Sequence, residues 1–283
     1  ERPLQDMLQS GEPDFPFCVC WANESWTRRW DGGEDLVLMR QDPSEANALA
    51  FIRSLVPLVA DKRYIRIGMR PMILIYRVDM IPSVTRIASL WREEMRRQGV
   101  GEIYLVAVQT TIEVDPAQIG FDASCEFPPH QMPRTTYNDA QVFHEEFAGK
   151  IFDYREAVRT KEHESPHPYK RFPGVMTRWD NTPRRGRRAH IFANATPDWY
   201  GHWLKNALTE SVRRHAPEER FVFINAWNEW AEGAYLEPDE DSAYALLETT
   251  RDTLLATRTD ASPLEQHAGL SGDDPADDAA WNA

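Results

Sequence analysis

The feature that most constrains the fold is a repeated alternation of short β-rich runs with longer amphipathic segments. Six such runs occur in succession, and no Asn-Gly hairpin signal lies between them. Strands that are each followed by a helix are expected to run parallel, joined by right-handed crossovers. The predicted strands span residues 15–21, 70–76, 102–109, 120–127, 172–178 and 220–226, and the predicted helices span 1–10, 42–60, 82–97, 140–159, 196–215 and 239–257.

A parallel α/β chain can form a doubly wound sheet or a (β/α)8 barrel. No Gly-x-Gly-x-x-Gly and no Walker-type motif follows a strand, which disfavours the nucleotide-binding sheets. Polar and aromatic residues instead follow nearly every strand, as in barrel enzymes, whose sites lie at the carboxyl ends of the strands. We therefore predict a TIM-type barrel domain over 1–258 that holds strands 3 to 8, with the first two strands upstream, and a disordered tail or linker over 259–283.

The net charge of the chain makes some classes of binding partner unfavourable. A net charge of -13 disfavours a general affinity for nucleic acid, because phosphates would be repelled. No run of apolar residues is long enough to predict a membrane span. Three cysteines cannot all pair, which favours a reducing compartment, and we predict a cytoplasmic protein. The expected substrate is neutral or is held by local contacts.

Two carboxylates in the segment 226–233 are the strongest catalytic candidates. Glu229 and Glu232 follow the apolar run 221–224, and two Trp residues and an Asn lie beside them. An E-x-x-E spacing alone is typical of a solvated helix face, but a buried strand end and the neighbouring Trp residues favour a pocket. Unequal burial would separate the two pKa values, which supplies the acid and the base that glycoside cleavage requires.

Other strand ends carry residues suited to sugar binding, because indole rings pack on the C–H faces of sugars and amide or carboxylate groups bind hydroxyls. For the Trp-rich segment 21–30 the alternative is a loop packed on the barrel rim, and for Asp180 it is a tight turn. The predicted substrate-binding residues are Trp21, Asn23, Glu24, Trp26, Trp30, Tyr76, Gln109, Glu126, His130, Trp179, Asp180, Trp227, Asn228 and Trp230.

No metal site and no cofactor is predicted. His163 and His167 stand near two Glu residues, but two prolines in the same segment favour a solvated loop. No Gly-x-Ser-x-Gly nucleophile elbow occurs, which disfavours serine hydrolase chemistry.

Three segments in a fixed order resemble the WbsX family, whose members are described as glycosyltransferases of polysaccharide biosynthesis, and also glycoside hydrolase family 99. These segments are Phe17 to Gly32, Arg178 to Thr182 and Asn225 to Pro238, and the resemblance covers roughly residues 1 to 255. It implies a (β/α)8 barrel and a retaining, metal-independent reaction within α-mannose-containing glycans. By position, Glu229 matches the carboxylate that deprotonates the sugar 2-hydroxyl, and Glu232 matches the acid and base. The family's Pro-Gln-Phe-His motif on the first strand is absent here.

The leading hypothesis is therefore a glycosidase-like enzyme that cleaves a polysaccharide, with mannose as a candidate sugar. One alternative is a glycosyltransferase that builds lipopolysaccharide, O-antigen or another surface polysaccharide from an activated donor. The other is a barrel that binds glycans without catalysis.

Overall fold

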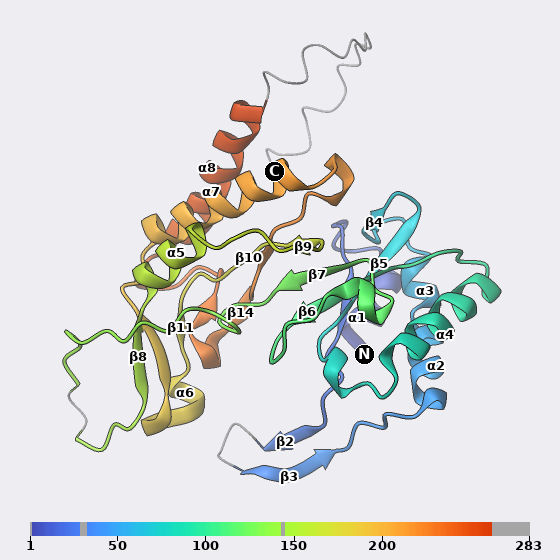
Figure 1. Cartoon of the computed structure of the whole chain (residues 1–283), viewed down its shortest axis with the longest axis horizontal. Coiled ribbons are helices and arrows are strands. Elements are labelled where there is room, and N and C mark those ends of the chain that lie inside the picture. The colour runs from blue at the N-terminus through green and yellow to red at the C-terminus, as the bar shows by residue number, and fades with distance from the viewer. Residues whose placement is uncertain (1, 29–32, 143–144, 262–283) are drawn as a thin grey trace.

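The largest sheet of the protein is parallel and follows the order of the chain. The computed structural model describes residues 2–28, 33–142 and 145–261 (Figure 1). Every step of the main ladder is parallel, which confirms the predicted α/β class. The strands are β1 (Val19–Trp21), β5 (Arg70–Ile75), β6 (Tyr104–Gln109), β7 (Ala123–Glu126) and β9 (Arg171–Phe172), with β4 (Arg66–Ile67) antiparallel to β5.

The fifth and sixth predicted strands are shorter than expected. Pro173 has no N–H to donate to a ladder, and it separates β9 from β10 (Gly174–Val175). β10 pairs in parallel with β13 (Phe223–Ile224), which is all that forms a ladder in the predicted run 220–226. Among the described residues no pairing joins β13 back to β1, so the ladder is open and a closed barrel is not confirmed.

Two apolar layers cover the faces of the main sheet, because successive strand residues point to opposite faces. Ile73 and Ile75 of β5 pack toward α2 (Glu45–Ser54), α3 (Val56–Val59) and α4 (Val84–Arg97). Met72 and Leu74 pack on the other face, with residues of β6, β7 and β9. In Figure 1 these three helices lie together on the right of the sheet.

A second core lies in the C-terminal half and was partly mispredicted. The predicted helix 140–159 is wrong, because residues 150–153 form a strand, β8 (Lys150–Asp153), parallel to β12 (His190–Ala193). The helix α5 (Tyr154–Glu162) begins only after it, where the Asp153 side chain accepts a hydrogen bond from the backbone N–H of Arg155 at 2.9 Å. α5 packs with α7 (Pro197–Arg214) and α8 (Ala245–Ala261) around this core (Figure 1).

Among the described residues, three antiparallel strand pairs occur outside the main parallel sheet, although the sequence predicted no hairpins. β2 (Trp26–Arg28) pairs with β3 (Gly33–Met39), β11 (Trp179–Asp180) with β12, and β14 (Asn228–Glu229) with β15 (Ala234–Tyr235). The sequence holds an Asp-Gly pair, Asp31-Gly32, between β2 and β3, and Asp-Gly is a hairpin signal like Asn-Gly. The remaining helices are α1 (Arg2–Ser10), α6 (Thr182–Arg185) and the 3-10 turns Val78–Met80, Pro116–Ile119, Gly186–Arg188, Pro217–Glu219 and Trp230–Glu232.

The last described helix, α8, runs through the predicted domain boundary at residue 258, and residues 262–283 of the predicted tail lie outside the described residues. No helix in the described ranges combines the length and the apolar character that crossing a bilayer requires.

Candidate active site

The acid pair lies on a hairpin rather than on a helix. Glu229 ends β14, and Glu232 closes the 3-10 turn that leads to β15. Gly233 follows with φ of +59°, a left-handed conformation that costs glycine little. A Cβ at this position would also lie 2.9 Å from the backbone N and O of Asp180, so the hairpin can approach β11 only because Gly233 has no side chain.

One guanidinium joins the two carboxylates. Arg184 of α6 donates from Nη1 to Oε1 of Glu232 at 2.8 Å and from Nη2 to Oε1 of Glu229 at 2.9 Å. α6 lies between β11 and β12, so this contact connects the hairpin to the neighbouring sheet. The two carboxyl groups are therefore held close together by one cation.

The two carboxyl groups differ in how deeply they are buried. Burial is the main cause that raises the pKa of Glu232, and the charge of Glu229 raises it further, whereas Arg184 and Arg185 act in the lowering direction. The Glu232 side chain is 23% exposed and that of Glu229 is 40% exposed. A raised pKa suits Glu232 to the role of a general acid, which must hold its proton near neutral pH.

A cavity of about 660 Å³ opens in front of the pair. This volume lies within the range of small-molecule sites. Its wall includes seven of the sixteen residues predicted from the sequence as catalytic or substrate-binding, and they come from five separate strand ends and loops. They are Glu24, Trp26, Tyr76, His130, Trp179, Glu229 and Glu232, with Trp30 outside the described residues.

Arg77, which follows β5, holds Glu24 of the cavity wall in place. Its guanidinium pairs with Glu24 and also binds Asp79, with Nη2 to Oδ2 at 2.7 Å. Asn23 is 2% exposed and exchanges two hydrogen bonds with the Arg77 backbone, each 2.8 Å long. Asn23 is therefore a positioning residue that joins the loop after β1 to the loop after β5.

Tyr76 and His130 complete this side of the cavity around Phe127. The Tyr76 ring meets Phe127 edge-on at 5.5 Å, and the His130 ring stacks on Phe127 at 5.7 Å. Burial raises the pKa of Tyr76 to about 12, with Glu24 and Glu232 as further causes. Burial lowers the pKa of His130, and Arg134 and Arg77 lower it further, so both side chains enter the cavity uncharged at neutral pH.

Several predicted binding residues do not line the cavity, and three of them, Trp21, Gln109 and Glu126, pack or pair elsewhere, contrary to the prediction. The Trp21 ring stacks on Phe51 at 4.0 Å and joins the core below the helices. Gln109 is 2% exposed and bonds the backbone of Val114 through both its amide atoms. Strand alternation explains both, because these side chains point away from the cavity.

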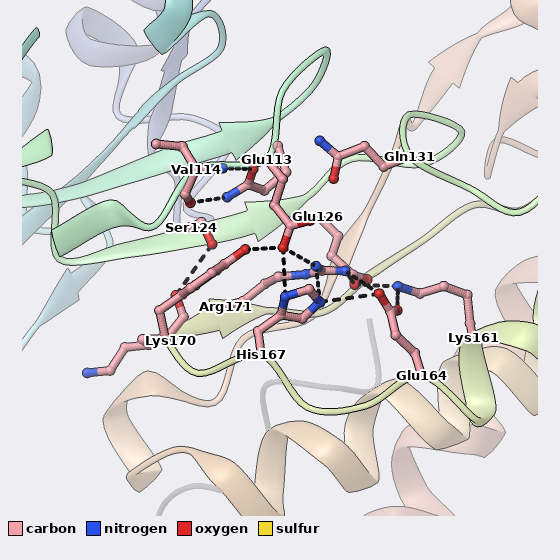
Figure 2. A network of polar contacts seen from close by, with 12 residues as sticks. Glu113, Val114, Ser124, Glu126, Gln131, Lys161, Glu164, His167, Lys170 and Arg171 are labelled. Carbon is pink, nitrogen blue, oxygen red and sulfur yellow. Dashed lines mark hydrogen bonds and ion pairs between the residues drawn. The ribbon is translucent and has the colours of Figure 1, made fainter. Parts of the chain in front are cut away.

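Glu126 is the third, and it belongs to the polar network of Figure 2. It contacts Lys161 at 2.7 Å, pairs with Arg171 and accepts from the Gly174 backbone N–H at 3.0 Å. His167 joins the same network, next to Arg171 (Figure 2). Glu126 therefore ties β7 to α5 and β9, and it has no free face toward the cavity.

The residues beside the acid pair form the outside of the hairpin. Trp227 and Trp230 are 52% and 46% exposed, and both indole N–H groups donate to Glu237. Asn228 is also exposed and lies off the cavity wall. Asp180 accepts from the Thr182 backbone N–H at 2.9 Å, which is the tight turn considered as its alternative.

Basic and amide residues of the cavity were missed from the sequence. Arg134, Asn181, Arg184, Arg185, His190 and Asn225 all line it. Two of them carry buried polar atoms with no hydrogen-bond partner among the described residues, Arg184 Nε and Asn225 Oδ1. A donor and an acceptor left open in one cavity match the hydroxyl groups of a sugar. The Arg-Arg pair after Pro183 was the one local sequence feature that could have indicated basic residues at this site.

A second depression of about 560 Å³ adjoins the cavity. Arg134 and Phe152 belong to the walls of both, so the two hollows meet at these side chains. A ligand longer than one sugar unit could extend from the acid pair across this junction.

Replacing Arg184 by Met is expected to shift the basic limb of the pH profile of kcat/KM upward. Arg184 lowers the pKa of Glu232, so its removal lets Glu232 stay protonated to higher pH. The rate itself should fall roughly ten-fold or more, since a charged hydrogen bond to each carboxylate is lost. Initial rates measured from pH 4 to 9 test this.

Arg187→Met is the matched control for that measurement. Arg187 follows the same helix, has a side chain 61% exposed and pairs with Glu146 instead. Its profile should be unchanged. A uniform loss of rate in Arg184→Met, with no movement of the limb, would show that Arg184 only supports the fold.

Comparison with known families shows to which protein family the chain belongs. The family model described as "Glycosyltransferase WbsX" matches residues 1–250. The chain belongs to the WbsX family. Two WxcX proteins of uncharacterised function, from two strains of Xanthomonas campestris pv. campestris, are 41% and 40% identical to this family member over 255 residues. Those residues are 90% of this chain and 37% of each relative, so the chain spans just over a third of their length.

Solved structures with a similar fold include glycoside hydrolases. A family 99 endo-α-mannosidase from Bacteroides thetaiotaomicron superposes with a TM-score of 0.52 at 13% identity, over 91% of this chain and 80% of that enzyme. Its complex with bis-tris-propane gives 0.51 at 14%, over 93% and 85%. A glycoside hydrolase-like protein gives 0.51 at 13%, over 75% and 62%. At these identities the likeness is one of fold.

Proposed function

We propose that this WbsX-family protein cleaves glycosidic bonds within a polysaccharide by a retaining, two-carboxylate reaction. The observation that carries the proposal is the acid pair, in which the half-buried Glu232 carboxyl has a raised pKa and lies beside the more exposed Glu229. Unequal carboxylates facing one cavity are the arrangement that glycoside hydrolysis uses.

The reaction would proceed in two steps. In the first, Glu232 gives its proton to the leaving glycosidic oxygen as the C1–O bond breaks, while Glu229 takes the proton of the 2-hydroxyl and O2 bonds to C1. In the second, Glu232 removes a proton from water, the hydroxide oxygen bonds to C1, and O2 leaves and regains its proton from Glu229. The assignment of roles follows the family resemblance, and the burial of Glu232 supports it.

Mannose is the candidate sugar, because the structural neighbours from Bacteroides are endo-α-mannosidases by name. Surface polysaccharide is the candidate polymer, from the WbsX description. The sugar and the polymer are both parts of the proposal, because likeness of fold does not identify a substrate.

The second candidate is a glycosyltransferase, which the family description favours. It would use the same cavity but would need a donor with an activated leaving group. The third is a glycan-binding protein, in which the acid pair is idle.

One assay separates the three. The full-length protein is incubated with α-mannan oligosaccharides and bacterial surface polysaccharides, with and without sugar nucleotides, and products are resolved by mass spectrometry. Cleavage without donor supports the proposal, elongation only with donor supports the transferase, and binding without either product supports the third. If no glycan is cleaved and elongation occurs only with a sugar nucleotide, the hydrolase proposal is wrong.

A further inference from the structure

The acidic residues of the cavity wall each have a cationic partner. Arg184 binds Glu229 and Glu232, and Arg77 pairs with Glu24. Arg134 lines the same wall, and no carboxylate among the described residues pairs with it. Its guanidinium carbon lies 6.0 Å from the centre of the Phe152 ring, which lines the same wall.

The surroundings of His190 are basic. Burial lowers the pKa of His190, and Arg134, Lys150 and Arg185 lower it further. Lys150 is the strand partner of His190 in the β8–β12 ladder. His190 is therefore neutral at pH 7 and lies near cationic side chains that line the cavity and the adjoining depression.

The overall composition makes this local excess unusual. The chain has 45 acidic residues and 32 Lys or Arg, so most cations have carboxylates to pair with. A cation that lines a cavity without a protein partner can bind an anion from solution with little competition.

We infer that the Arg134 end of the cavity binds an anionic group of the substrate, so that the natural glycan carries a negative charge on the unit next to the one at the acid pair. The inference rests on the proposed function for the sugar, and it adds the substrate class. Arg134 also lies where the cavity meets the second depression, which is where a neighbouring unit of a longer glycan would lie. A carboxylate on a uronic acid and a phosphate of a sugar nucleotide share the required chemistry.

Calorimetry with matched ligands tests the inference. The first pair is a glucuronic-acid-containing oligosaccharide and the same oligosaccharide after reduction of its carboxyl groups. We expect the acidic form to bind roughly ten-fold tighter at low salt, and the difference to shrink as ionic strength rises. Inorganic phosphate and a uridine diphosphate sugar form the second arm, and tighter binding there would assign the anion as phosphate.

Variants locate the effect. Arg134→Gln should abolish the preference for the acidic ligand, and Arg134→Lys should keep most of it, which separates charge recognition from misfolding. Lys62→Gln removes the same charge from an exposed residue that precedes β4, at the amino-terminal end of the strands, and should bind like the unmodified protein.

Equal binding of acidic and neutral ligands in both arms, or a preference that survives in Arg134→Gln, would overturn the inference. These outcomes are distinct from failure of the proposed function. Anion-dependent binding without any cleavage contradicts the proposed hydrolase activity but supports the anion site. Glu232-dependent cleavage with no preference for charged ligands supports the hydrolase activity but contradicts the anion site.

Discussion

Glu232→Gln is expected to lower the rate of glycan cleavage by about 10²–10⁴-fold, the contribution typical of a positioned general acid. Gln keeps the size of the side chain and a hydrogen-bond acceptor for Arg184, but it has no proton to give to the leaving oxygen. The loss should fall mainly on kcat, because the substitution leaves the cavity wall in place. Initial rates with an oligosaccharide and with an aryl glycoside of the same sugar measure it.

The aryl glycoside makes the result diagnostic. Its phenolate leaves without help from an acid, so Glu232→Gln should lose much less on this substrate than on the oligosaccharide. Glu237→Gln is the control, since Glu237 is an acid on the same segment that binds the exposed indoles of Trp227 and Trp230. Equal losses on both substrates would show that Glu232 is not the acid.

Trp91→Ala is expected to cost about 3–5 kcal/mol of unfolding free energy, the range for removal of a large buried aromatic side chain. Trp91 is fully buried on α4, and its indole N–H donates to the Ala48 carbonyl of α2 at 2.9 Å. Its ring meets Trp21 at 6.0 Å and Phe51 at 5.9 Å. Deleting it opens a cavity between two helices and the sheet and removes the indole hydrogen bond that joins α4 to α2.

Urea unfolding followed by circular dichroism measures this loss as a shift of the midpoint at constant slope. Trp227→Ala is the control, because Trp227 is 52% exposed and should change stability by less than about 1 kcal/mol. A Trp91→Ala midpoint within error of the unmodified protein would mean that the core between α2 and α4 contributes little.

Local pattern predicted the parts of the fold that depend on near neighbours. Apolar runs such as 70–76 and 102–109 are buried on both faces, and a parallel strand buried this way has to be continuously apolar. The polar residues after each strand were found for a related reason, since parallel strands bring their carboxyl ends to one edge. The errors fell where a single residue changes the outcome, as Pro173 does in splitting β9 from β10.

The aromatic predictions show the limit of pattern alone. Trp21 and Trp26 stand on the same short segment, yet one packs under the helices and the other lines the cavity. Side-chain alternation assigns opposite faces along a strand, but a sequence does not say which face meets the core once the strand ends.

The sequence by itself determined the parallel α/β class and the buried strands of the main sheet, because hydrophobic periodicity acts within a few residues. Only the tertiary structure decided what surrounds Glu229 and Glu232. Arg184 reaches the two carboxylates from 45 and 48 residues away, and Arg134 lines the same cavity from another segment. Such pairs depend on how distant elements pack, and packing sums many weak contacts that no local pattern records.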